Sequence, residues 1–173
     1  MKCPRCGLIV TDEVPRCLGC GFTLEDLDRK IGKVPERLGL VNDFARILSN
    51  EAKASLESHL ETFRQARGGE IVLVTASLTS PAKPSEYVFW LFNRWEVGGA
   101  GHEGLMLLLA MKERRIESEV GYGWEDIASD VETGAILDEY VVPLLKEEKI
   151  DQALAAAVDR LTALFKAEPM PGG

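Results

Sequence analysis

All four cysteines of the chain lie within its first twenty residues, in two Cys-x-x-Cys pairs. The pairs are Cys3/Cys6 and Cys17/Cys20, and each is followed by a glycine that permits a tight turn beneath the sulfur atoms. Two such pairs separated by a short loop supply the four thiolates of a closed tetrahedral zinc site. We therefore predict one structural Zn²⁺ held by Cys3, Cys6, Cys17 and Cys20, with no position left for water or substrate.

The same cysteines could instead form two disulfides or a redox pair. Disulfides need an oxidising compartment, and the opening Met1-Lys2-Cys3 lacks the apolar stretch of an export signal. A redox Cys-x-x-Cys motif would not come paired at this spacing. The sequence therefore favours zinc, and we expect a cytoplasmic protein.

Composition narrows the classes of partner. With 173 residues, 46% hydrophobic and 28% charged, the chain is typical of a globular protein. Its net charge is −8, and four thiolates with one Zn²⁺ would lower it by a further two. Nucleic-acid binding depends on neutralising phosphates with basic side chains, so we expect protein partners instead. The most apolar run, residues 105–111, is too short to insert into a membrane.

The chain divides into three regions and a tail. Residues 1–22, which contain the four cysteines, are predicted to form a zinc ribbon, called the ribbon below. Residues 23–40 are predicted to form a charged connector with a short helix capped by Thr23. Residues 41–168 form the main domain, and residues 169–173 are expected to be a disordered tail.

Helical and strand patterns alternate through the main domain. Helices are predicted from Ser49 to about Arg67, after Pro84, over about 132–145 and over about 150–166. Strands are predicted over 70–76, 105–111 and 115–120. Pro143 should end or kink its helix, and Trp95 should pack the second helix onto the sheet. This alternation predicts a central sheet covered on both faces.

A Gly-Tyr-Gly turn follows the last predicted strand and is succeeded by three carboxylates within six residues. They are Glu125, Asp126 and Asp130. Clustered carboxylates and exposed carbonyls suit a hard cation such as Ca²⁺ or Mg²⁺. The alternative is an acidic turn whose Asp130 begins the next helix and interacts favourably with its dipole.

Several motifs, found in one order, resemble the TPM domain family. They are Val41-Asn-Asp43-Phe-Ala45 with the following Leu48-Ser49, the strand 71–75, Leu91-Phe92…Trp95…Gly98, the strand 104–109, Val120-Gly-Tyr-Gly-Trp-Glu125 with Asp130, and Pro143. Together they cover about residues 40–166. The resemblance implies an α/β/α sandwich around a small mixed sheet, here preceded by the zinc ribbon.

The resemblance also implies divalent-cation binding at loops on one end of the sheet and, for some members, acid phosphatase activity. Asp43, Glu125 and Asp130 match the acidic positions of the family. The chain departs from the pattern at Gly99 and Ala100, where the family usually has Asp and Lys, and at Asp126, where it usually has Gly.

Three functions are therefore considered. The favoured one is a cytoplasmic interaction or regulatory module that binds zinc in the ribbon and Ca²⁺ or Mg²⁺ through Asp43, Glu125, Asp126 and Asp130. The alternative is a weak metal-dependent acid phosphatase, for which only Arg94 and His102 are plausible basic neighbours. A third is binding of nucleic acid or protein through the ribbon.

Overall fold

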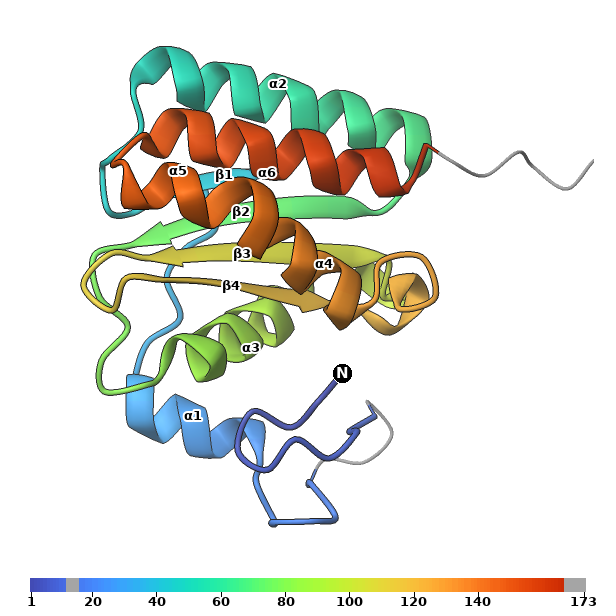
Figure 1. Cartoon of the computed structure of the whole chain (residues 1–173). Helices are drawn as coiled ribbons and strands as arrows, with labels where there is room; N and C mark the ends of the chain where they lie inside the picture. Colours follow the sequence, from blue (N-terminus) through green and yellow to red (C-terminus); the bar gives the residue numbers. More distant parts are fainter. Residues whose placement is uncertain (12–15, 167–173) are drawn as a thin grey trace, which may run out of the picture.

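The computed structural model describes residues 1–11 and 16–166, so the tail predicted for 169–173 lies outside the described residues. A four-stranded sheet forms the centre of the molecule (Figure 1). Its strand order is β1 (Val41–Asp43), β2 (Glu70–Ala76), β3 (Gly104–Ala110) and β4 (Arg115–Val120). The first three strands are parallel and β4 is antiparallel to β3, which confirms the expected mixed sheet.

The core is centred on the two middle strands. All seven residues of β3 are buried, as are six of the seven in β2. A strand with packed layers on both faces carries a continuous apolar run rather than an alternating one, as the segments 71–74 and 105–109 do.

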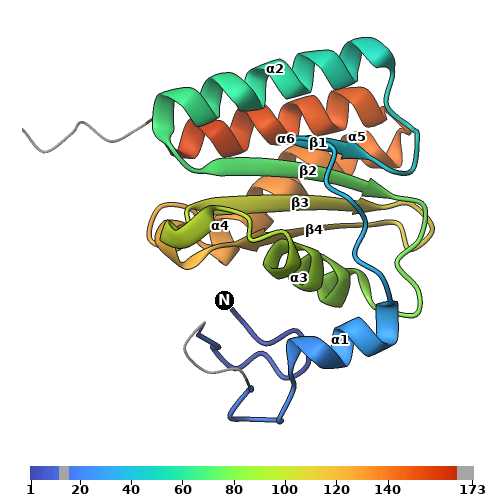
Figure 2. The same ribbon diagram turned by 180° about the vertical axis from the view of Figure 1, so that it is seen from behind.

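Helices cover both faces of the sheet (Figures 1 and 2). One face carries α2 (Asn50–Arg67), α4 (Asp130–Ile136), α5 (Val142–Lys146) and α6 (Ile150–Leu164). The other carries α3 (Pro84–Arg94), against which α1 (Leu24–Ile31) packs from outside. Single turns η1 (Gly99–Gly101) and η2 (Tyr122–Trp124) flank β3 and β4. Within residues 1–11 and 16–166, none of the helices combines the length and apolar character needed to cross a membrane.

Local signals set several helix ends. The Ser49 hydroxyl accepts a hydrogen bond from the Ala52 N–H and caps α2, and Thr23 forms a capping box with Asp26 at α1. Pro143 lacks an N–H, and just before it the chain widens into a π-helical turn, η3 (Leu137–Val141), between α4 and α5.

The buried tryptophan of α3 is Trp90 rather than Trp95. Trp90 is 0% exposed and donates its indole N–H to Asp28 of α1 at 2.8 Å. Trp95 is only half-buried: its indole N–H donates to the Pro35 carbonyl, and its ring meets Phe44 edge-on. The difference arises because α3 lies between the sheet and α1, so that two of its faces are covered. Trp95 lies just after the helix and binds the connector through its hydrogen bond to Pro35.

Candidate metal centre

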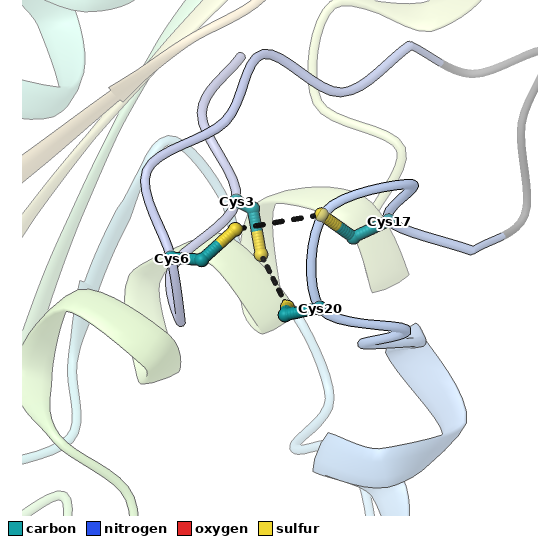
Figure 3. Close-up of side chains that lie close together, drawn as sticks. All are labelled: Cys3, Cys6, Cys17 and Cys20. Atoms are coloured by element: carbon teal, nitrogen blue, oxygen red, sulfur yellow. Dashed lines mark hydrogen bonds between the residues drawn. The ribbon is translucent and has the colours of Figure 1, made fainter.

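The four cysteine sulfurs converge on one point. All lie within 4.8 Å of one another, and Figure 3 shows the side chains directed toward a common centre. The Cys3–Cys20 and Cys6–Cys17 sulfur separations are 3.7 Å and 3.6 Å. A tetrahedral site with Zn–S bonds of about 2.3 Å has sulfur–sulfur edges of about 3.8 Å. A disulfide would need about 2.05 Å, so the separations fit a shared ion and not paired sulfurs.

The backbone builds the two halves of the centre in the same way. The Gly7 N–H donates to the Cys3 carbonyl at 2.9 Å, and the Gly21 N–H donates to the Cys17 carbonyl at 2.8 Å. Both glycines have positive φ, 79° and 74°, a conformation that glycine adopts without a steric cost. The glycines after each pair are thus required by the turns that aim the sulfurs.

Each half of the centre has one buried and one exposed cysteine. Cys3 and Cys17 are buried, whereas Cys6 and Cys20 are exposed. The backbone N–H of Cys20 lowers the pKa of the Cys17 thiol to about 7, while burial raises the pKa of Cys3. A thiolate is the metal-binding form of cysteine, so backbone N–H groups directed at sulfur favour the ligand state.

The ribbon packs against the main domain. Met1, Cys3, Cys17 and Phe22 belong to the same buried cluster as the residues of α3 and β3. The Phe22 ring meets Phe89 of α3 edge-on at 6.0 Å between centroids. The Tyr122 hydroxyl donates to the Val10 carbonyl. The sulfur cluster therefore lies at an interface between ribbon and domain.

The connector strengthens this attachment. Asp28 of α1 accepts from Trp90 and forms an ion pair with Arg94, and this pair lowers the Asp28 pKa. Lys30 lies 2.8 Å from Glu86 at the start of α3. Phe22, Asp28 and Lys30 thus contact α3 from Glu86 near its start to Arg94 at its end.

The four predicted carboxylate ligands do not come together. Asp43 ends β1 and is in register with Thr75 near the end of β2. The carboxylates after β4 lie at the other end of the sheet, because Val120 pairs with Leu105 near the start of β3. Asp43 therefore cannot share an ion with Glu125, Asp126 and Asp130, and this part of the predicted site is corrected.

Asp43 has a structural role. Its carboxylate accepts from the Thr75 hydroxyl at 2.6 Å and from the N–H groups of Ile47 and Leu48, both at 3.2 Å. Lys53 lies 3.7 Å away. Burial acts to raise the Asp43 pKa, but the hydrogen bonds prevail and hold it below its ordinary value. The residue fixes the turn between β1 and α2.

Two of the other carboxylates face the ribbon. Glu125 accepts from the amino group of Met1, and Asp130 lies 3.9 Å from the Lys2 ammonium. The sequence analysis missed Glu119 of β4, whose pKa is raised to about 8 by burial and by the nearby Asp130. Acidic residues at alternate positions of the strand, Glu117 and Glu119, were the available signal. In the described part of the chain, the cysteines form the only group of three or more side chains placed to hold a metal.

The sequence-family comparison agrees with this architecture. The model of the TPM domain matches residues 41–164, from the first strand to the end of the last helix. The chain belongs to the TPM domain family. The ribbon and connector precede the matched region.

Solved structures share the fold of this TPM domain protein. An N-terminal domain from P. gingivalis is 26% identical, with a TM-score of 0.68 over 72% of this chain and 80% of that one. An N-terminal domain from Corynebacterium glutamicum is 14% identical, with a TM-score of 0.61 over 83% and 91%. The BA42 protein from Bizionia argentinensis is 14% identical, with a TM-score of 0.61 over 70% and 83%. No curated protein sequence matched.

Proposed function

We propose that this chain binds one structural zinc ion through Cys3, Cys6, Cys17 and Cys20, and that the zinc-loaded ribbon and the TPM domain together form one non-catalytic binding module. The observation that carries the proposal is the sulfur cluster itself, whose separations of 3.6 Å and 3.7 Å fit a tetrahedral zinc site. With four protein ligands, the ion would have no open position for a substrate.

The burial of the cluster indicates what zinc does. Cys3 and Cys17 lie in the common core with Phe22, so the ion would hold the ribbon in the shape that packs on α3. A reducing compartment such as the cytoplasm suits this role, because thiolates must stay unpaired to bind zinc.

The phosphatase alternative finds less support. Catalysis on a phosphate ester needs a basic group near the metal to stabilise developing charge. Arg94 instead forms a hydrogen-bonded ion pair with Asp28, and the ring of His102 contacts Tyr122. Calcium or magnesium binding by Glu125, Asp126 and Asp130 stays a prediction, now without Asp43.

The proposal is tested by metal analysis of protein made under reducing conditions with zinc present. We expect one zinc per chain in the wild type and less than about one tenth of that in Cys17→Ser, since three thiolates leave the site incomplete. Leu18→Ser is a matched control inside the same turn, because Leu18 is 84% exposed and offers no ligand. Wild-type protein without bound zinc would refute the proposal.

A further inference from the structure

The outer edge of the sheet offers backbone groups for pairing. β4 is the last strand in the order and, among the residues that the structure describes, pairs only with β3. The Gly121 N–H donates to the Gly104 carbonyl, which fixes the alternation of the antiparallel pair. The N–H and C=O groups of Ile116 and Ser118 therefore point away from β3. Within residues 1–11 and 16–166, no backbone hydrogen bond outside the regular elements involves either residue.

A groove lies along this edge, and we name it the β4 groove. It has a volume of about 330 Å³. One wall is the strand segment 115–119, and the other is formed by Gly134, Leu137 and Asp138, which lie on one side of α4 and η3. Figure 1 shows α4 running beside β4 at the edge of the sheet. A groove between an edge strand and a helix is a setting in which an extended peptide can add to a sheet.

The groove is lined by more carboxylate groups than basic groups. Its basic side chains are already matched: Lys2 lies 3.9 Å from Asp130, and Arg115 lies 3.3 Å from Glu117. Two further carboxylates line the groove, those of Glu119 and Asp138. Neither forms an ion pair with the residues that the structure describes. Burial, and after it the neighbouring carboxylates Asp130, Glu125 and Glu117, raise the pKa of Glu119 to about 8, so Glu119 holds its proton at neutral pH and a partner's basic group would favour its ionised form.

We propose that the β4 groove binds an extended basic segment of a partner protein. The segment pairs through its backbone with Ile116 and Ser118, and its lysine or arginine side chains meet Glu119 and Asp138. Lys2 gives a precedent within the chain, because its ammonium group already lies in this groove beside a carboxylate.

A second copy of the chain fits the groove less well. Edge-to-edge pairing of two β4 strands would bring two sets of unmatched carboxylates together, between molecules that each carry a net charge of −8. Like charges facing each other across a strand pair are destabilising. A basic segment relieves the same charges.

The test uses the full zinc-loaded chain and a synthetic peptide of about seven residues that alternates lysine and threonine. We expect saturable binding by calorimetry that weakens with salt, and no binding of a glutamine-for-lysine peptide. Asp138→Lys should weaken binding by about tenfold, since it places a like charge against the peptide. Glu139→Lys is the matched control, because Glu139 is also exposed on the same turn but does not line the groove.

A second pair of variants tests the backbone pairing. Ser118→Pro removes an N–H that β3 does not use, so the sheet should persist while peptide binding is lost. Ser118→Ala keeps the N–H and should bind as the wild type does. Amide exchange at Ile116 and Ser118 should slow when the peptide binds.

Three results would overturn the proposal. They are no binding at millimolar peptide, equal weakening by Asp138→Lys and Glu139→Lys, or unchanged binding by a folded Ser118→Pro variant. Self-association of the wild type that Ser118→Pro abolishes would assign the edge to a second copy instead.

Discussion

The cysteine cluster and the predicted carboxylate site differ in how far apart their residues lie in the sequence. The cysteines fall within eighteen consecutive positions, Cys3 to Cys20, and two matching turns bring them together. The predicted carboxylate site combined Asp43 with residues in the segment 125–130, so their proximity depended on which ends of two strands lie together. The cluster built by local turns formed as expected, and the set that needed strand topology did not.

The ribbon also shows that a local motif can have a nonlocal effect. The sequence suggests an independent ribbon followed by a connector, yet Met1, Cys3, Cys17 and Phe22 pack in the core of the TPM domain. Disrupting the cysteine cluster should therefore lower the stability of the whole chain. This consequence can be measured.

The largest expected effect is that of zinc removal. Chelation should release the ribbon from α3 and uncover Phe89, so we expect the melting temperature of the whole chain to fall by on the order of 10 °C. Calorimetry with and without chelator would measure it. Cys17→Ser should reproduce the fall, and chelator should have no further effect on that variant.

Independent unfolding of the ribbon and the TPM domain would contradict this prediction. An early transition of the ribbon alone, followed by a main transition at the wild-type temperature, would show that the domain from residue 40 onward keeps its stability without zinc. The shared core would then contribute little.

The next effect concerns the contact between connector and domain. Trp90→Ala should cost about 3–5 kcal/mol of unfolding free energy, because it empties a fully buried site and leaves Asp28 without its indole donor. Trp95→Ala should cost about 1–2 kcal/mol, because Trp95 is half-buried and follows the helix. Urea unfolding of both variants gives the comparison, and a larger loss in Trp95→Ala would contradict it.

A smaller effect should appear in the pH dependence of stability. The Glu119 pKa is about 8 in the folded chain against 4.5 for the ordinary group, so the folded state holds a proton that the unfolded state has released between these values. Stability should therefore fall as pH rises from about 5 to about 8 and then level off. The loss should be on the order of a few kcal/mol, because each unit of difference between the folded and unfolded pKa values corresponds to about 1.4 kcal/mol.

Glu119→Gln should flatten this part of the profile, because glutamine does not titrate. Glu117→Gln on the same strand is the control. An unchanged slope in Glu119→Gln would show that another group binds the proton.

The sequence predicted most of the elements because their signals are local. The capping residues Thr23 and Ser49, the buried strand 70–76 and the break at Pro143 each act within a few positions. It also identified the family, since the TPM motifs keep their order along the chain.

Contacts between segments far apart in the sequence could not be predicted from these local signals. Trp90 was not identified as a core residue, because the stripe predicted to face the sheet accounts for only one side of α3 and α1 covers another. Glu119 was not identified either, because nothing in the sequence shows that Asp130 and Lys2 lie beside the same groove.

The smallest expected effect is that of calcium, and it distinguishes the two ends of the sheet. An ion at Glu125, Asp126 and Asp130 would have to displace the Met1 amino group from Glu125 and Lys2 from Asp130. Because these contacts already offset the negative charge, millimolar calcium should raise the melting temperature by only about 1 °C.

Two variants decide which carboxylates are involved. Asp130→Asn should abolish the small calcium response. Asp43→Asn should lower stability by about 1–3 kcal/mol, because it disturbs buried hydrogen bonds, while leaving the calcium response intact. If Asp43→Asn instead removed the response and Asp130→Asn did not, the ion would lie at the end of the sheet where β1 meets α2, and the separation of the carboxylates argued from the strand register would be wrong.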